Sequence, residues 1–460
     1  MSKTSDVREA LKKIPSLDEI LQSFNLDNIP LQLFKDKLRK SLQKVRDNIK
    51  DNNIPDNISK YTLDQASKDF DYVANPSLKR VINGTGIILN TSLGRAPISK
   101  SILNSINETI YPYCNLEVDI NTNKRGDRLN HIEPLLNSLV GSEKSILVNN
   151  NAAAVMIMLN SLCKGKEVII SRGQQVEIGG SFRIPDIIKS SGCKMIEVGT
   201  TNKTHLNDYS KAIHKKTGAI LYVHTSNYKV IGFTKNVELQ KLSKLCKKNK
   251  IPLLCDLGSG AIYNNDFMPV EKEVQNYIKD GVDVVTYSGD KLLGGTQAGV
   301  ISGNKNLIVK IHNNPIYRTL RCDKYRIALL EKILRTYITT KKITSENLSI
   351  KLFNRTQDNL IINANKIIKL IKNKVPKHYN IKINESKVEA GSGSLPTEKI
   401  PSIAISFSSN KISSNKISSN LRSGSIPILN YINNDRVFID LKAIPDDQIN
   451  ELISTMKECL

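Results

Sequence analysis

A lysine in a glycine-rich loop is the first residue whose setting suggests chemistry. The stretch TYSGDKLLGGTQAG, residues 286–299, follows the apolar run DVV and contains Lys291. Ligands of α/β proteins bind just past strand ends. A lysine desolvated there is a plausible Schiff-base former, because burial favours its neutral, nucleophilic amine. Ser288 could reach a phosphate bound at the same place. On this stretch alone, a lysine on a surface turn stays possible.

Asp256 supplies a second group for the same chemistry. It directly follows the apolar run IPLLC, and a carboxylate buried at a strand end needs a cationic partner. The protonated ring nitrogen of pyridoxal phosphate is such a partner, because an aspartate there lets the ring act as an electron sink. An aspartate on one strand, followed about 35 residues later by Ser-x-x-Lys on another, is the usual order in fold-type I enzymes.

A strand-to-helix turn could hold the phosphate of this cofactor. The run NNNAAAVMIML places Asn150, Asn151 and Ala152 at a predicted helix N-terminus, where free N–H groups bind phosphate. These features together predict a pyridoxal phosphate enzyme, the alternative being an accidental collection of turn residues. His224, at another strand end, either faces the cofactor ring or is a buried, hydrogen-bonded histidine.

Three arginines could form a second anion site. Arg95 lies in NTSLGRAP, and Arg318 and Arg321 lie three residues apart in YRTLRCDK, so the latter two share a helix face. Converging arginines suit a second phosphate-like anion, and ordinary surface ion pairs are the alternative. Cys322 is expected to be an inert thiol. No cluster of His, Cys and carboxylates has metal-ligand spacing, so no metal is expected.

The elements that must position these residues alternate along the middle of the chain. Short apolar runs such as KSILVNN and KEVIIS alternate with helical stretches, which predicts βαβ units and a mainly parallel sheet. We therefore expect an α/β catalytic core over residues 66–330. The strand-like runs PSIAISFS and DRVFIDLK and a closing helix predict a small α+β domain over residues 331–460.

The N-terminal residues 1–65 are predicted to form a helical domain with a basic surface. Apolar residues recur at helical spacing between residues 33 and 50, with lysines and arginines on the opposite face. The chain carries a net charge of +23, which suggests a polyanionic partner such as nucleic acid. A lysine- and asparagine-rich composition inherited from a biased genome would give the same charge.

Composition also indicates where the protein works. The 460 residues imply two or three domains. Seven scattered cysteines without a CxxC pair are typical of a reducing cytoplasm. The N-terminus lacks the apolar segment of a secretory signal, and no apolar run is long enough to span a membrane. We expect a soluble, cytoplasmic protein.

The sequence resembles the bacterial L-seryl-tRNA(Sec) selenium transferases, or selenocysteine synthases, along nearly its whole length. The resemblance is strongest between Val81 and Lys324 and weaker over the first 70 residues. The motifs that carry it are RVINGTGIILNTSLGRAP, VNNNAAAV, SRGQQVEIGGSFRIPDI, VGTTNKTHLNDY, VHTSNYKVIGFT, CDLGSG, SGDKLLGGTQAG, LRCDK and GSGSLP.

The resemblance implies a specific reaction. Lys291 would carry pyridoxal phosphate as an internal aldimine, which the α-amine of serine esterified to tRNA(Sec) displaces. Lys291 would then move the α-proton, and Asp256 would hold the ring proton that stabilises the carbanion. Loss of the β-hydroxyl gives dehydroalanyl-tRNA, and selenium from selenophosphate adds to give selenocysteinyl-tRNA(Sec). Arg95, Arg318 and Arg321 match the family's site for the phosphate of the selenium donor.

The family also implies an assembly, a homodecamer built as a ring of dimers, in which each N-terminal domain grips the tRNA. This chain departs from the usual family motifs at Ser92, Gln174 and Lys203, which puts contacts around those positions in doubt. Two alternative functions share the same features: a small-molecule pyridoxal phosphate lyase built on the same core, and an RNA-binding protein that has lost catalysis.

Overall fold

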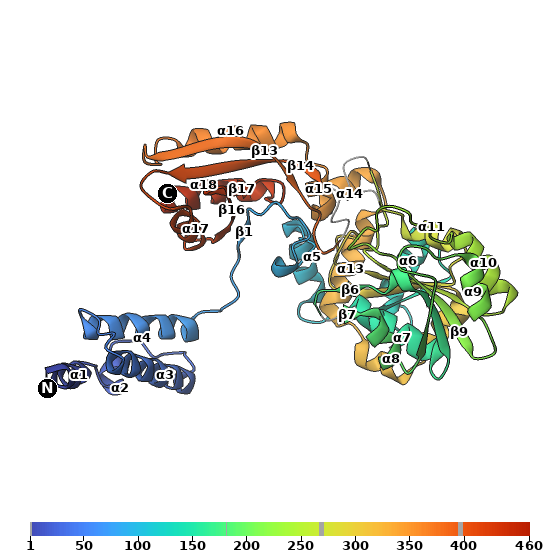
Figure 1. The fold of residues 1–460 in the computed structure, drawn as a ribbon, viewed down its shortest axis with the longest axis horizontal. Coiled ribbons are helices and arrows are strands. Elements are labelled where there is room, and N and C mark those ends of the chain that lie inside the picture. The colour runs from blue at the N-terminus through green and yellow to red at the C-terminus, as the bar shows by residue number, and fades with distance from the viewer. Residues whose placement is uncertain (1, 181, 266–270, 394–398) are drawn as a thin grey trace. The chain divides into compact units, whose positions relative to one another are not determined.

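The structure is a computed structural model that describes residues 2–180, 182–265, 271–393 and 399–460. Ser181 and residues 394–396, which belong to two of the family motifs, lie outside the described residues. The chain divides into two compact units, residues 1–81 and 82–460 (Figure 1). Among the described residues, no helix is long and apolar enough to cross a membrane.

The N-terminal unit consists of helices. These are α1 (Ser2–Lys12), α2 (Leu17–Gln22), α3 (Leu31–Lys50) and α4 (Ile58–Ala74). The apolar stripe predicted between residues 33 and 50 lies on α3, and all five of its side chains are buried: Phe34, Leu38, Leu42, Val45 and Ile49. The rings of Phe24 and Phe70 stack beside Phe34, with centroids 4.7 Å apart for the stacked pair. This unit therefore has its own small core.

Seven strands form the central sheet of the second unit, in the order β4-β12-β11-β10-β9-β5-β8. Their bounds are β4 (Lys144–Val148), β5 (Glu167–Ser171), β8 (Lys194–Val198), β9 (Thr217–Val223), β10 (Leu253–Gly258), β11 (Val284–Ser288) and β12 (Gly299–Gly303). All neighbours are parallel except β12, which runs antiparallel to β11 and β4. Most of these strands are buried along their whole length, as expected for a sheet covered on both faces.

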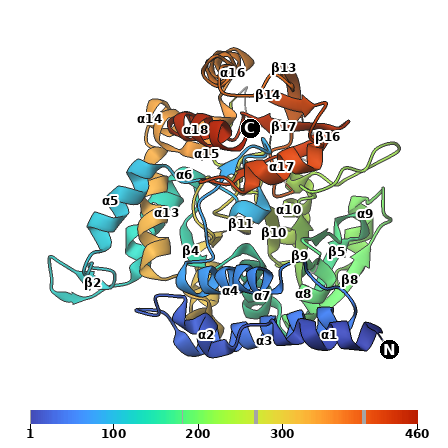
Figure 2. The same cartoon turned by 90° about the vertical axis from the view of Figure 1, so that its left-hand side faces the viewer.

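Helices and short elements connect these strands. The helices are α5 (Lys100–Ile110), α6 (Glu133–Val140), α7 (Asn151–Cys163), α8 (Ile184–Ser190), α9 (Leu206–Ala212), α10 (Leu239–Lys248), α11 (Val274–Lys279), α12 (Lys305–His312) and α13 (Lys324–Thr336). Two short hairpins pair β2 (Val118–Asp119) with β3 (Lys124–Arg125) and β6 (Glu177–Ile178) with β7 (Phe182–Arg183). The 3₁₀ segments are η1 (Thr91–Leu93), η2 (Arg128–His131), η3 (Arg172–Gln174) and η4 (Pro315–Leu320). Helices α5 and α13 pack side by side (Figure 2).

The C-terminal part has a second sheet, antiparallel, in the order β13-β14-β17-β16. Its strands are β13 (Tyr379–Val388), β14 (Ile400–Ser409), β16 (Tyr431–Asn433) and β17 (Arg436–Asp440), with β15 (Ile428–Leu429) nearby in sequence. Its helical segments are α14 (Thr340–Glu346), α15 (Leu348–Phe353), α16 (Gln357–Ile371), α17 (Ser414–Arg422), η5 (Asp446–Gln448) and α18 (Ile449–Cys459). Helix α16 lies along β13 and β14 (Figure 1), so an α+β architecture is present here, as predicted.

The predicted domain boundaries can be placed on these elements. Residue 65 lies inside α4, and residue 330 lies inside α13, whose buried side chains belong to the core around the seven-stranded sheet. The strand β1 (Ile82–Asn83) pairs in parallel with β15, so the start of the second unit packs with the C-terminal part. The division into three domains stays a prediction.

Candidate active site

Lys291 lies three residues beyond β11, in a loop folded tightly against its own backbone. A β-carbon added to Gly289 would lie 2.7 Å from the Thr296 carbonyl oxygen, so this approach requires glycine. The Lys291 side chain is buried, with 7% exposure. Burial lowers its pKa, and the nearby Asp256 carboxylate opposes that shift. The site therefore favours a neutral amine, as expected for a nucleophilic lysine.

Asp256 lies on β10 with 3% exposure. Three hydrogen bonds converge on its Oδ1 atom: from Asn151 Nδ2 at 2.8 Å, from the Thr286 hydroxyl at 3.2 Å and from the Gly258 N–H at 3.3 Å. In the described part of the chain, none reaches Oδ2. Burial raises the pKa of this carboxyl, and the hydrogen bonds and Lys291 act against burial. A cationic ring nitrogen beside Oδ2 would supply the missing partner.

The N-terminus of α7 provides backbone donors. Asn150 caps the helix, its side-chain oxygen accepting the Ala153 N–H at 2.8 Å. A β-carbon on Gly299 would lie 2.2 Å from the Asn150 carbonyl oxygen, so β12 reaches this turn only because position 299 is glycine. The first N–H groups of a helix have no partner within it. Those of Asn151 and Ala152 are therefore available to a phosphate.

His224 is held by a hydrogen bond. Its Nε2 atom lies 3.2 Å from Glu271 Oε1, and its ring packs edge-on against Tyr277. Glu271 is buried, and its second oxygen has no partner in the described structure. Of the two interpretations of His224, the structure shows the hydrogen-bonded histidine, and a quarter of its side chain is exposed. Ser288 is buried at the end of β11.

These residues fit pyridoxal phosphate. The fit rests on the Asp256 oxygen without a hydrogen bond in the described structure, the buried amine of Lys291, whose pKa burial lowers, and the free N–H groups at the start of α7. A β-carbon on Gly258 would lie 3.9 Å from Lys291 Nζ, which brings the amine to the carboxyl end of β10.

Sequence analysis missed Asp290, which links Arg95 to this site. Arg95 Nη1 donates to Asp290 Oδ2 at 2.6 Å, and the Ala96 N–H donates to the Asp290 carbonyl at 3.2 Å. Asp290 is buried and directly precedes Lys291. Its position inside SGDK was the available signal, but nothing in the sequence marked Arg95 as its partner.

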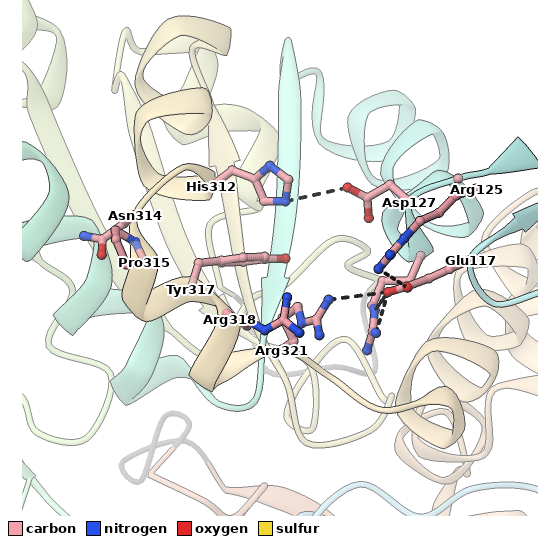
Figure 3. A pocket seen from close by; sticks show the side chains of 11 residues that line it. Glu117, Arg125, Asp127, His312, Asn314, Pro315, Tyr317, Arg318 and Arg321 are labelled. Carbon is pink, nitrogen blue, oxygen red and sulfur yellow. Dashed lines mark hydrogen bonds and ion pairs between the residues drawn. The ribbon is translucent and has the colours of Figure 1, made fainter.

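Arg318 and Arg321 line a separate cavity of about 440 Å³ (Figure 3). Arg321 Nη1 lies 3.4 Å from Glu117 Oε1, and its Nε is buried without a partner in the described structure. Arg318 is exposed. Arg95 does not line this cavity, so the chain brings together two of the three predicted arginines.

The same cavity contains residues that sequence analysis did not select. Glu117 accepts hydrogen bonds from Arg125 at 3.2 Å and from Arg128 at 2.5 Å. The bond from Arg128 holds the pKa of Glu117 below its usual range, so the carboxylate stays ionised. With its four arginines, the cavity remains suited to an anion. Cys322 follows Arg321 in the sequence and is buried. Burial raises the pKa of its thiol to about 12, so the thiol stays protonated.

Comparisons with known proteins identify the family. The profile described as "SelA: L-seryl-tRNA selenium transferase" matches residues 81–445. An L-seryl-tRNA(Sec) selenium transferase of Clostridium botulinum (strain Okra / Type B1) is 39% identical over 99% of this chain and all of its own length. The chain belongs to the L-seryl-tRNA selenium transferase family.

Other relatives agree with this assignment. The selenium transferase of Clostridium perfringens (strain ATCC 13124) is 39% identical over 98% of this chain and 99% of its own. Among solved structures, D-glucosaminate-6-phosphate ammonia-lyase is similar with a TM-score of 0.57 at 20% identity, over 83% of this chain and 96% of that one. This likeness and the strand order confirm the predicted fold-type I architecture.

At the departures from the usual selenium transferase motifs, the structure shows a side-chain contact for Gln174 and backbone contacts for Lys203 and Ser92. Gln174 is buried, and its Oε1 accepts the Val223 N–H at 3.2 Å, which ties η3 to the end of β9. Lys203 is exposed and forms an isolated parallel bridge with Lys235. The Ser92 N–H donates to the Asn90 side chain at 3.0 Å.

Proposed function

We propose that this chain converts seryl-tRNA(Sec) to selenocysteinyl-tRNA(Sec), with selenophosphate as selenium donor and pyridoxal phosphate as cofactor. The observation that carries the proposal is 39% identity, over 99% of the chain, to an enzyme named L-seryl-tRNA(Sec) selenium transferase. The burial of Lys291 and Asp256 at adjacent strand ends supports it, because this chemistry needs both groups in one dry site.

Lys291 is the residue we propose to hold the cofactor and to move the α-proton of serine. Burial lowers the pKa of its amine, which favours the neutral form in which Nζ can accept that proton. Bound pyridoxal phosphate supplies an electron sink for the negative charge that develops at the α-carbon, which lets the β-hydroxyl leave and selenium add. Asp256 would keep the ring nitrogen protonated through its second oxygen, while Asn151 and Thr286 hold Oδ1.

The cofactor's phosphate is proposed to bind at the N-terminus of α7, on the N–H groups of Asn151 and Ala152, with Asn150 as the cap and Ser288 as a further donor. His224 is proposed to lie beside the ring, oriented by Glu271. Gly299, at the start of β12, follows the loop that contains Lys291 and packs against Asn150, the cap of α7. This contact brings the lysine loop close to the N-terminus of α7.

For the selenium donor we propose Arg95, Arg318 and Arg321. Each of these arginines has a planar guanidinium group, which can donate two hydrogen bonds to a phosphate group. Arg321 has a buried Nε without a partner in the described structure, and Arg318 has no recorded ion pair there. Arg95 is coupled to Lys291 through Asp290. Anion binding by these residues is a separate proposal from the cofactor chemistry.

The tRNA is proposed to bind the N-terminal unit. Around its buried stripe, α3 carries seven basic side chains: Lys35, Lys37, Arg39, Lys40, Lys44, Arg46 and Lys50. Arg39 and Lys50 pair with Asp36 and Asp47 on the same helix. The excess of basic side chains can neutralise RNA phosphates. We also propose that the chain works in the cytoplasm as a homo-oligomer, a decameric ring of dimers. Exposed Tyr111, Tyr113 and Ile120 support contacts between copies.

One reaction tests the function. Protein loaded with pyridoxal phosphate is incubated with selenophosphate and tRNA(Sec) carrying radiolabelled serine, and the aminoacyl group is then identified. Selenocysteine is expected, and Lys291→Ala is expected to leave serine unchanged. Unchanged serine with the unmodified protein would contradict the proposal. Turnover of a free amino acid without tRNA would favour the small-molecule lyase.

A further inference from the structure

A buried asparagine contacts the loop that carries Lys291. Asn347 ends α14 and caps α15, and its side chain is fully buried, with 0% exposure. Its Nδ2 atom donates to the Leu293 carbonyl at 3.2 Å, and its Oδ1 atom accepts the Ile350 N–H at 3.3 Å. One side chain therefore joins the start of α15 to the backbone two residues after Lys291.

The lysine loop is shaped to receive this contact. The Gly294 N–H donates to the Lys291 carbonyl at 2.9 Å, which closes a tight turn over residues 291–294. Gly294 has a φ of +73°, and a β-carbon there would lie 2.5 Å from Asn347 Oδ1. Both the backbone conformation and the close approach of Asn347 therefore require glycine at this position.

The Leu293 carbonyl has a second side-chain donor. Tyr337, the residue after α13, donates its hydroxyl to this carbonyl at 2.7 Å. Burial raises the pKa of the Tyr337 hydroxyl, so it stays protonated and remains a donor. A carbonyl oxygen has two lone pairs, and in this turn both have a partner.

The other end of α15 is fixed by two buried cations. Lys442 Nζ donates to the carbonyl oxygens of Phe353 and Arg355, at 3.1 Å and 2.6 Å. In return, Arg355 Nη1 donates to the carbonyl oxygens of Leu441 and Ile444, at 3.0 Å and 2.6 Å. Lys442 and Arg355 are both buried. These contacts tie α15 to the chain that follows β17, so Asn347 projects from a fixed helix.

The lysine loop needs support from outside because of its own composition. Glycine occupies positions 289, 294, 295 and 299, and glycine leaves the backbone more conformational freedom than any other residue. A group that performs catalysis must be held close to one geometry by the residues around it. Contacts from elements outside the loop supply that restraint.

We propose that Asn347 is a positioning residue for Lys291. Its amide, together with the Tyr337 hydroxyl, holds the turn over residues 291–294 so that the amine stays buried beside Asp256. Asn347 acts through the backbone of the lysine loop and not on the substrate. This inference rests on the function proposed above, which gives Lys291 its part in the reaction.

The test uses a substitution that removes the amide and keeps the helix cap. Asn347→Ser is suitable, because serine caps a helix about as well as asparagine but lacks the amide that donates to Leu293. Tyr337→Phe removes only the second donor. Asn304→Ser makes the same replacement at the cap of α12, where the side chain accepts the Asn306 and Leu307 N–H groups, and is the control.

The first readout is the pKa of the Lys291 amine in the cofactor-free protein. The rate at which acetic anhydride acetylates Lys291 is followed by mass spectrometry over a range of pH. Burial lowers this pKa more than Asp256 raises it. Asn347→Ser and Tyr337→Phe are therefore expected to raise it by about one unit, toward the ordinary value near 10.4, because a loosened turn lets water reach the amine. The charged groups near the amine are the same in every variant: Asp256, Glu271, Asp290 and Arg95.

The second readout is the reaction itself. Asn347→Ser is expected to lower kcat about tenfold, the cost of a misplaced catalytic group, and to leave the KM for seryl-tRNA unchanged. Asn304→Ser is expected to change neither the Lys291 pKa nor kcat.

Two results would overturn the proposal. One is a Lys291 pKa in Asn347→Ser equal to that of the unmodified protein. The other is an equal shift in Asn304→Ser, since the effect would then be a general response to a changed helix cap. Because the pKa is measured without cofactor, tRNA or selenophosphate, the two proposals fail separately. A shifted Lys291 pKa in Asn347→Ser, in a protein that makes no selenocysteinyl-tRNA, would refute only the proposed function.

Discussion

Asn151 Nδ2 donates a 2.8 Å hydrogen bond to Asp256 Oδ1, so α7, whose N-terminus is the proposed phosphate site, also orients the carboxylate. The hydroxyl of Thr286, on β11, donates to the same oxygen at 3.2 Å. The second oxygen is left for a cationic partner. The Asn151 side chain therefore links two parts of the proposed cofactor site.

Asn151→Ala should reduce catalysis more than binding of the tRNA. Without its amide, Asp256 loses the shortest of its hydrogen bonds and its orientation. We expect kcat to fall about tenfold to a hundredfold, the usual cost of a misplaced catalytic group, with the KM for seryl-tRNA unchanged. Steady-state kinetics at saturating cofactor checks this. A change confined to KM would show that Asn151 serves substrate binding instead.

Arg318→Ala should weaken use of the selenium donor. Arg318 has no recorded ion pair in the described structure, so its removal leaves no buried charge unpaired. We expect the KM for selenophosphate to rise about tenfold, the loss of one charge-assisted contact. Arg335→Ala breaks an exposed ion pair with Glu331 on α13 and is the control. Equal effects of both variants would argue against a donor site at Arg318.

Gly299→Ala should destabilise the second unit. The added methyl group would lie 2.2 Å from the Asn150 carbonyl oxygen, so the backbone must shift. We expect a loss of about 1–3 kcal/mol in the free energy of unfolding, as for other overpacked sites. Urea denaturation measures it. Gly126→Ala, whose new methyl group meets only ordinary contacts from 3.6 Å, should be nearly neutral, and equal losses would contradict the packing argument.

Lys291 should make the stability of the cofactor-free protein depend on pH. Burial lowers its pKa, so over the range between the folded and unfolded pKa values the unfolded chain binds more protons. Stability therefore rises with pH until the unfolded pKa near 10.4 is passed. The Lys291→Met variant has no amine at this position, so this pH-dependent contribution to its stability is absent.

The comparison is made between pH 7 and pH 10, using the thermal midpoints of the two cofactor-free proteins. The Met variant should be the more stable one at pH 7, and its advantage should shrink as the pH rises. An advantage that stays constant would mean that the buried amine carries no titration penalty.

The sequence was sufficient to predict the elements around the lysine. Lys291 and Asp256 follow short apolar runs, and such runs form buried parallel strands whose carboxyl ends meet at one edge. The predicted sheet, the α+β C-terminal part and the helical N-terminus follow from the same periodicity. The site roles of individual residues stay predictions.

Pairings between distant segments were beyond sequence reasoning. Asp290 meets Arg95 across 195 residues, and Arg321 meets Glu117 across 204. Which charge pairs with which depends on how loops pack after the sheet has formed, and no local pattern encodes it. For the same reason, the sequence did not show which of the three predicted arginines would converge. Within one chain, Arg318 and Arg321 line one cavity, and Arg95 does not line it.

Every proposed step of the reaction depends on the attachment of pyridoxal phosphate to Lys291. Purified protein loaded with the cofactor is reduced with borohydride, digested and analysed by mass spectrometry. A phosphopyridoxyl group is expected on the peptide that contains Lys291 and on no other peptide. An unmodified Lys291, or an adduct at a different lysine, would contradict it.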